Sequence, residues 1–335
     1  MRAVQVVSPG KAVFVEAPIP QMAPGKALVR TLLLSLCGSD VHMLHYHPPE
    51  EYPFGVGSSG HEMVGVVEAI DAPEAGVKVG DVALVLAPEQ QAMSEYYLAD
   101  VENVLVLPPG RPLEHFLMAQ QLGTVIYACR RLPNVVGMDA VVIGQGSAGL
   151  FFDAMLRRMG ARQIIGLDVQ EARVAAGLKF GATHTFNDAL VDPLEQIKKL
   201  TGGKLADVVI EAVGEIEAIN LAPDLVKVGG HVLYFGVPRG PHVIEFNFWN
   251  LFRKYCHTTS SGGSALEPGR ASFRMALDLI VGGEIDVAPM ITHRFSFDQV
   301  MEAYELARTR GDGVIKIVIE MPGYTTRSSG CSNTE

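Results

Sequence analysis

The sequence predicts an α/β fold in which a doubly wound parallel sheet stands beside a separate, mostly β domain. Two observations carry this prediction. The chain has 335 residues, of which 48% are hydrophobic, and so exceeds what one hydrophobic core usually serves. Its pattern also changes near residue 139, from short strands separated by Pro and Gly to wholly apolar runs that alternate with amphipathic segments.

The first of these regions reads as a series of short strands. Apolar and polar residues alternate there between turn residues, as they do in half-buried strands. The expected strands are 3–7, 12–16, 27–34, 62–70 and 82–86. Residues 1 to about 110 are therefore expected to form the mostly β domain.

The second region has the pattern of parallel strands covered by helices. Its buried strands are expected at 140–143, 164–167, 207–210 and 231–235, each too short for a helix. Between the first two, Ala148, Phe151, Phe152, Met155 and Met159 fall on one helical face, which completes a βαβ unit. Two helical stretches, 270–281 and 298–308, and a last strand, 314–320, follow.

Composition argues against several classes of protein. Charged residues make up 19% of the chain and the formal net charge is −10, so no basic field is available to bind nucleic acid. No run of 18 apolar residues suits a membrane span, and the N-terminus lacks the apolar core of an export sequence. The four cysteines lie far apart, which is typical of a protein of the reducing cytoplasm.

Glycine spacing predicts a dinucleotide site. Gly144, Gly146 and Gly149 form a GxGxxG pattern directly between a buried strand and an amphipathic helix. The first allows a tight turn, the second lets the backbone approach a pyrophosphate, and the third lets the helix pack closely on the strand. The start of the helix also offers free N–H groups to phosphates. The other residues of this cofactor-binding turn are Gln145, Ser147 and Ala148.

Asp168 indicates which cofactor to expect. It ends the second apolar run, where a carboxylate accepts hydrogen bonds from the adenosine ribose. A 2′-phosphate would meet a like charge there, which favours NAD over NADP, although Arg173, a helical turn further on, offers such a phosphate a cation. The alternative is a purely structural turn followed by a surface carboxylate. The agreement of strand, helix and acidic residue disfavours it.

A second set of residues suits a metal ion. The motif LCGSDVH contains Cys37, and GSSGHEMVGVV contains His61 and Glu62. Taken singly, Cys37 is more often a small buried hydrophobe than a ligand, and His61 is more often structural. Together, thiolate, imidazole and carboxylate are the donors of a catalytic zinc site.

These motifs and the glycine-rich unit together resemble the zinc-containing alcohol and polyol dehydrogenases of the medium-chain dehydrogenase/reductase superfamily. The resemblance spans nearly the whole chain, from MRAVQVV through CGSDVH, GHEMVGVV, GVKVGDVAL and VVIGQGSAGL to ITHRFSFDQVMEAYELA. It implies a Rossmann domain over residues 124–263, inserted into a GroES-like catalytic domain formed by residues 1–123 and 264–335.

The resemblance also implies roles for single residues. Cys37 and His61 would bind one catalytic zinc ion, and Glu62 would be a carboxylate that supports the ion or exchanges onto it. Ser39 would accept the proton of the substrate hydroxyl, and His42 would pass it to solvent through the ribose hydroxyls. Zinc would ease the loss of that proton, and the hydride would pass to the nicotinamide.

The sequence departs from this family in two places. Where the family usually has a third metal-site residue, commonly Glu followed by Pro, or Cys, this chain has Gln120 and Gln121. The site could close as Cys37, His61, Glu62 and water, could use Gln120, or could bind zinc poorly. Between residues 81 and 100 the four closely spaced cysteines of many relatives are missing, so no structural zinc is expected.

The expected function is hydride transfer between a small-molecule alcohol, of the secondary alcohol or polyol type, and NAD. A homodimer is the expected assembly, with a homotetramer as the alternative. Two other functions stay open. One is a zinc-independent NAD(P)H reductase of the same superfamily, whose members usually lack the Cys and GHE motifs. The other is a dinucleotide-binding sensor without turnover, which only Gln120 favours.

Overall fold

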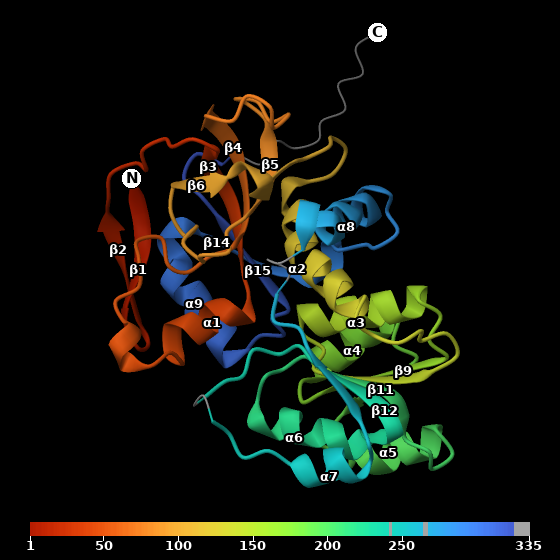
Figure 1. Cartoon of the computed structure of the whole chain (residues 1–335). Helices are drawn as coiled ribbons and strands as arrows, with labels where there is room; N and C mark the ends of the chain where they lie inside the picture. The colour runs from red at the N-terminus through yellow and green to blue at the C-terminus, as the bar shows by residue number, and fades with distance from the viewer. Residues whose placement is uncertain (241–242, 264–266, 325–335) are drawn as a thin grey trace.

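Two β-sheets joined by helices make up the protein (Figure 1). The computed structural model describes residues 1–240, 243–263 and 267–324. Within these ranges a seven-stranded sheet lies in one half of the molecule and a six-stranded parallel sheet in the other, with a two-stranded hairpin at the N-terminus. The predicted fold class, a doubly wound parallel sheet beside a mostly β part, is confirmed.

The seven-stranded sheet combines both ends of the chain. Its order is β14-β15-β3-β4-β5-β7, with β6 paired to β3. β15 runs antiparallel to β3, with Ile317 opposite Leu36. The strands of this half are β3 (Lys26–Leu36), β4 (Glu62–Ile70), β5 (Val82–Leu86), β6 (Tyr96–Asp100), β7 (Val104–Val106), β14 (Ile291–Ser296) and β15 (Lys316–Glu320), and those of the hairpin are β1 (Arg2–Ser8) and β2 (Lys11–Glu16).

The six-stranded sheet is parallel, with the order β10-β9-β8-β11-β12-β13. Strands β8, β9 and β10 follow one another from the centre of the sheet toward one edge, and β11, β12 and β13 follow one another toward the other edge. The direction of the strand order therefore reverses between β8 and β11. In such sheets ligands bind outside the carboxyl ends of the strands at this reversal. The strands are β8 (Asp139–Ile143), β9 (Gln163–Asp168), β10 (His184–Asn187), β11 (Ala206–Glu211), β12 (Val226–Tyr234) and β13 (His257–Ser260).

Helices cover both faces of the parallel sheet because alternate residues of its strands point to opposite sides. Ala140 and Val142 pack with α2 and α3, whereas Val141 and Ile143 pack with α5 and α6. The helices are α1 (Gly38–His45), α2 (Leu113–Cys129), α3 (Ser147–Arg158), α4 (Glu171–Lys179), α5 (Pro193–Leu200), α6 (Ile216–Leu225), α7 (Phe248–Arg253), α8 (Ala271–Val281) and α9 (Val300–Thr309).

One hydrophobic cluster joins the two halves. It contains Leu33 and Val64 of the seven-stranded sheet and Val142 of the parallel sheet, with side chains of α2 and α8 between them. Helix α2 is continuous from Leu113 to Cys129, so the expected domain boundary between residues 123 and 124 falls inside a helix. The two sheets are therefore connected by a packed helical layer.

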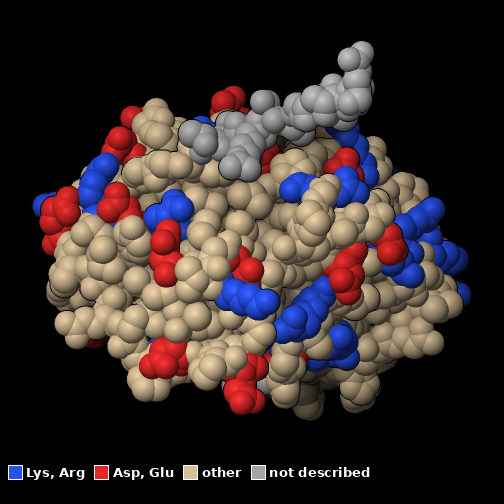
Figure 2. All heavy atoms as spheres, turned by 90° about the horizontal axis from the view of Figure 1, so that it is seen from above, with Lys and Arg blue, Asp and Glu red and all other residues tan. Residues whose placement is uncertain are grey.

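The surface carries charges of both signs. Figure 2 shows one face on which basic and acidic side chains are interspersed among other residues, with no continuous basic field. Among the helices of the described ranges, none is both long enough and apolar enough to cross a membrane.

Candidate active site

The glycine-rich turn lies between β8 and α3, where the order of the parallel strands reverses. Gly144 has a φ of 92°, which favours glycine. A Cβ at Gly149 would lie 1.8 Å from the Gly144 carbonyl oxygen, so a larger residue would push α3 away from the turn. At Gly146 the nearest atom to an added Cβ is 3.8 Å away, on Arg173. Gly146 therefore leaves open space beside the start of α3.

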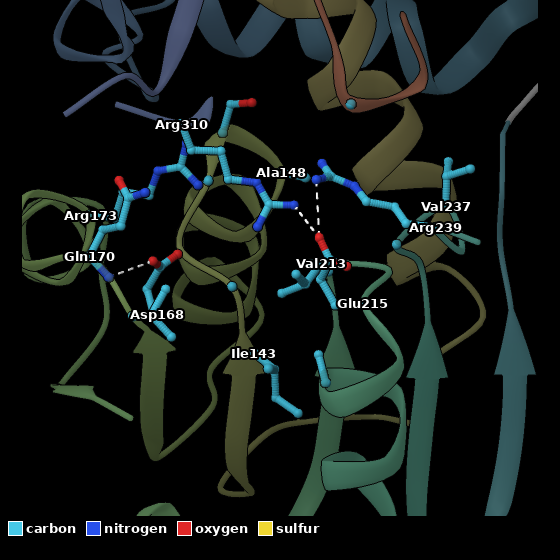
Figure 3. Close-up of a pocket in the computed structure, with 18 of the residues that line it drawn as sticks. Ile143, Ala148, Asp168, Gln170, Arg173, Val213, Glu215, Val237, Arg239 and Arg310 are labelled. Atoms are coloured by element: carbon cyan, nitrogen blue, oxygen red, sulfur yellow. Dashed lines mark hydrogen bonds and ion pairs between the residues drawn. The ribbon is translucent and has the colours of Figure 1, made fainter. Parts of the chain in front are cut away.

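Gln145 and Asp168 brace this turn. The buried Gln145 side chain fills the space above Gly166 and Gly177, where a Cβ would lie 2.6 and 2.2 Å from it. The Gln145 backbone N–H donates to Asp168 Oδ2 at 2.8 Å, and Asp168 Oδ1 accepts from the Gln170 N–H at 2.9 Å (Figure 3). Gln145 thus packs against β9 and α4, and it is not among the described residues that line the cavity beside the turn.

A cavity of about 640 Å³ opens beside the turn. Its size suits a cofactor. Asp168 lines it, and so do Glu215, Arg239 and Arg310, which were not predicted from the sequence. Glu215 and Arg239 follow β11 and β12, and a position just past a parallel strand was the feature that could have identified them. The residues of the turn that line the cavity are Gly144, Gly146, Ser147 and Ala148.

Arg173 lies between the glycine turn and the C-terminal part of the chain. Its Nε and Nη2 donate to the Val314 carbonyl oxygen at 3.0 and 2.7 Å. Burial lowers the pKa of Arg173, the Asp168 carboxylate opposes this shift, and the charge of Arg310 adds to it. A backbone carbonyl therefore tethers Arg173 at the edge of the cavity.

Cys37, His61 and Glu62 converge at another part of the same cleft. Cys37 caps α1 directly after β3, and Glu62 begins β4, where strand pairing places it opposite Ser35. One ligand atom from each of the three side chains lies within 4.8 Å of the other two. This is the one group of three or more His, Cys, Asp or Glu side chains so arranged within the described ranges. Strand pairing thus joins the two motifs.

Glu62 is held by a residue from the far end of the chain. Its Oε2 forms an ion pair with Lys316 Nζ, at 2.6 Å, and accepts a hydrogen bond from Ser35 Oγ. Lys316 and Glu62 are 1% and 0% exposed. Glu62 Oε1 has no hydrogen-bond partner within the described chain and lies 3.9 Å from His61 Nε2. Lys316 thus restrains one carboxylate oxygen, and the other remains available.

Asp40 ties the two motifs together. This buried carboxylate accepts the Cys37 N–H on Oδ2 at 2.6 Å and the Gly60 N–H on Oδ1 at 2.8 Å. The same Oδ1 lies 3.8 Å from His61 Nδ1. Asp40 therefore faces one ring nitrogen of His61, while the other, Nε2, lies on the side of Glu62.

The electrostatics of this group favour a thiolate. Burial and the Glu62 carboxylate act to raise the pKa of the Cys37 thiol, but a hydrogen bond with His61 and the charge of Lys316 bring it below its ordinary value. Burial likewise acts to lower the pKa of His61, yet Asp40 and Cys37 raise it well above its usual range. Since the thiolate is the form of cysteine that binds metals, the lowered pKa of Cys37 favours binding of a metal ion.

The two glutamines at the place where the resemblance implies a third metal-site residue take different positions. Gln121 is 7% exposed and its Nε2 donates to Cys37 Sγ at 3.8 Å. Its Oε1 has no hydrogen-bond partner in the described part of the protein. Gln120, the residue singled out from the sequence, lines a neighbouring cavity. Gln121, one position further along α2, is therefore the glutamine that contacts the cysteine.

The neighbouring cavity has a volume of about 230 Å³ and meets the larger one around Cys37. Cys37, Ser39 and Gln121 line both cavities, and His61 lines the smaller one. His42 is not among the described residues that line either cavity. It lies one turn after Ser39 in α1. Cys37 thus lies where a cofactor-sized cavity joins a substrate-sized one, with His61 in the wall of the smaller cavity.

Two family models match the chain in succession. Residues 23–109 match the model described as the alcohol dehydrogenase GroES-like domain. Residues 148–282 match the model described as zinc-binding dehydrogenase. The matched segments contain both metal motifs and most of the parallel sheet.

Whole-length relatives agree with these models. An alcohol dehydrogenase of Cupriavidus necator is 27% identical, with 96% of this chain and 98% of that protein covered. Sorbitol dehydrogenase 1 of Saccharomyces cerevisiae is 27% identical, with 93% and 96% covered. The solved structure of zinc dependent alcohol dehydrogenase 2 from Streptococcus pneumonia shares the fold, with a TM-score of 0.84 at 24% identity and coverage of 96% and 99%.

Proposed function

The chain belongs to the zinc-containing alcohol and polyol dehydrogenases of the medium-chain dehydrogenase/reductase superfamily, and we propose that it transfers hydride between a secondary alcohol or polyol and NAD, with one zinc ion. The observation that carries this proposal is the grouping of Cys37, His61 and Glu62, of which Cys37 lines both cavities and His61 lines the smaller one. A substrate in the smaller cavity has both the metal ligands and the cofactor cavity beside it.

The donor set fits zinc. Thiolate, imidazole and carboxylate are its usual ligands, and catalytic sites keep one position open. Buried polar atoms rarely lack a partner, yet Ser39 Oγ, His61 Nδ1, Glu62 Oε1 and Gln121 Oε1 all lack one among the described residues. Cys37 and His61 would hold the ion, with Glu62 or Gln121 completing the set. Bound zinc supplies a Lewis acid that eases loss of the substrate hydroxyl's proton.

The cofactor cavity supports NAD as the hydride carrier. Asp168 places a negative charge where a 2′-phosphate would lie, and a ribose hydroxyl can donate to the same carboxylate. Arg173, the residue that would favour such a phosphate, already donates to the Val314 carbonyl oxygen. When NAD is bound, its nicotinamide supplies the hydride acceptor.

Ser39 and His42 are proposed to move the hydroxyl proton. Ser39 lines both cavities and its Oγ is buried, so it can accept the proton of a substrate hydroxyl. His42 lies one turn along α1, with its ring centroid 4.9 Å from that of His47. The proton would leave by this route as the carbinol hydrogen leaves as hydride, which gives the carbonyl product.

The smaller cavity supports a polyol or another polar alcohol as substrate. Its lining includes the amide side chains of Gln90, Asn103 and Gln120 and the hydroxyl of Thr124. Such groups hydrogen-bond several substrate hydroxyls at once. A sorbitol dehydrogenase among the relatives points to the same class.

Turnover tests this proposal. Secondary alcohols and polyols would be screened with NAD and NADP, with formation of reduced cofactor as the readout. We expect oxidation of at least one alcohol, with a kcat/KM about tenfold or more higher with NAD. Ser39→Ala should lower kcat roughly 100-fold or more, because the proton loses its acceptor. Ser8→Ala, in β1 and outside both cavities, is the matched control.

Two results would refute the proposal. Binding of NADH without turnover of any alcohol in the screen would favour the sensor function. Equal reduction of enones or quinones before and after metal removal would favour the zinc-independent reductase.

A further inference from the structure

One carboxylate holds two of the arginines that surround the cofactor cavity. Arg239 Nη1 and Arg310 Nη2 both donate to Glu215 Oε1, at 3.1 and 2.7 Å (Figure 3). Glu215 caps α6 after β11 of the parallel sheet, whereas Arg310 ends α9 in the other half of the molecule. The ion pair between Glu215 and Arg310 therefore links the two halves across the cavity.

The arginines are more deeply placed than their partner. The side chains of Arg239 and Arg310 are 12% and 22% exposed, and that of Glu215 is 37% exposed. Burial and the charge of Arg310 both lower the pKa of Arg239, while Glu215 opposes them. The crowded cations need a counter-charge, and the carboxylate that supplies it is the exposed member of the group.

Arg239 and Arg173, which line the cavity together with Arg310, lie beside the expected path of a dinucleotide. Arg239 Nη2 is 3.9 Å from the position of a Cβ added at Gly38, at the start of α1. Arg173 Nη1 is 3.8 Å from a Cβ added at Gly146, in the glycine turn. Guanidinium groups bind phosphate oxygens through paired, charge-assisted hydrogen bonds. A pyrophosphate between the glycine turn and α1 would compete with Glu215 for Arg239 and Arg310.

We propose that Glu215 occupies, in the cofactor-free cleft, the two arginines that the cofactor's pyrophosphate takes, so that cofactor binding displaces this carboxylate. The inference rests on the proposed function, because it needs the cavity to bind a dinucleotide. Glu215 then lowers cofactor affinity and speeds cofactor release, since it returns to the arginines as the pyrophosphate leaves. When the cofactor is absent, the ion pair between Glu215 and Arg310 also connects the two halves of the molecule.

A pair of variants tests this role. Glu215→Gln removes the competing charge, and Glu217→Gln is the matched control, because Glu217 lines the same cavity, is exposed, and has no ion pair within the described ranges. The Kd values of NADH, ADP-ribose and adenosine would be measured by calorimetry on folded full-length protein. We expect Glu215→Gln to bind NADH and ADP-ribose about fivefold or more tightly than the wild type. Adenosine, which has no pyrophosphate, should show no gain.

Other binding results would overturn either the role of Glu215 or the dinucleotide site itself. Weaker binding by Glu215→Gln would overturn the inference and show that Glu215 positions the arginines for the cofactor. An equal gain in both variants would reduce the effect to general charge and would also overturn it. In an Arg310→Met background the gain should shrink, because one contested donor is gone. If the wild type binds neither NADH nor ADP-ribose, the dinucleotide site itself fails, and with it the proposed function.

Discussion

Lys316 and Glu62 form an ion pair from which water is excluded. Burial acts to lower the pKa of Lys316, but the charges of Glu62 and Cys37 raise it above its ordinary value. Removing one partner of such a pair typically costs about 3–5 kcal/mol, because the other charge is left buried and unpaired. Lys316 therefore limits how far the Glu62 carboxylate can move beside Cys37.

Asp153 gives a pH-dependent prediction at the residue scale. This carboxyl is fully buried in α3, and burial raises its pKa well above the usual value, which Gln145 offsets only in part. The unfolded chain has the ordinary pKa of about 3.9. Folded protein therefore binds the proton more tightly and loses stability as the pH rises from about 4 toward the folded-state pKa. Because the amide of Asp153→Asn does not titrate, this variant should not lose stability over that pH range.

Urea unfolding at two pH values checks this expectation. The free energy of unfolding of Asp153→Asn should exceed that of the wild type at pH 8 by about 1 kcal/mol or more. The advantage should shrink toward pH 5. Asp286→Asn, at an exposed position, controls for the loss of one carboxylate. A difference between Asp153→Asn and wild type that is the same at both pH values would contradict the buried, proton-binding state.

The sequence predicted those site residues that belong to local motifs. Cys37, His61 and Glu62 stand in short motifs of recognisable donor types, and pairing of β3 with β4 joins them. Lys316 and Arg310 enter the site only because the C-terminal strands return to β3, and no local pattern marks a lysine or arginine for such a place. These contacts could therefore not be predicted from spacing alone.

The start of α3 carries a prediction at the scale of one element. Gly149→Ala would place a Cβ 1.8 Å from the Gly144 carbonyl oxygen, so α3 must shift. Overpacking of this kind costs about 1–3 kcal/mol. Gly146 has a φ of −70°, which any residue adopts, so Gly146→Ala should fold normally but weaken NADH binding about tenfold or more. Thermal unfolding and NADH titration of both variants separate the two effects.

The test compares the stability of Gly149→Ala with the NADH affinity of Gly146→Ala. A Gly149→Ala protein as stable as the wild type would show that α3 does not pack as closely as described. Unchanged NADH affinity in Gly146→Ala would show that the cofactor does not approach the turn there.

The strands with a clear hydrophobic pattern were predicted correctly from the sequence. The expected strands 62–70 and 82–86 have the bounds of β4 and β5, and 207–210 lies within β11. Besides β6 and β7, the expected strands leave out β10, β13 and β14, and these last three have the sequences HTFN, HTTS and ITHRFS. These three strands lie at sheet edges and are only partly buried. They therefore contain many polar residues and lack the hydrophobic pattern by which a strand is predicted. The short α1 was not among the expected helices either.

At the scale of the whole molecule, one edge of the parallel sheet stands open. β13 pairs with β12 and with no other strand of the described ranges. The preceding α7 exposes Phe248, Trp249 and Phe252 by 59%, 68% and 60%, and Tyr255 is also exposed. Open edges and contiguous apolar patches mark association surfaces. We therefore expect a homodimer in which two β13 edges meet.

Sedimentation measures this directly. The wild type should have about twice the 36.0 kDa mass of one chain, and Phe252→Asp should shift it toward the monomer. Trp249 is the single tryptophan, so its emission should move to longer wavelength in the variant. A wild-type monomer with solvent-like Trp249 emission would rule out this interface.

Zinc content tests most directly whether Cys37, His61 and Glu62 form a metal site. Elemental analysis would be made on wild type, Cys37→Ser and Cys256→Ser purified without chelator. Cys256 lies outside the cluster and serves as the control. We expect about one zinc per chain in the wild type and in Cys256→Ser, and its loss in Cys37→Ser. Wild type without zinc, or full zinc in Cys37→Ser, would contradict it.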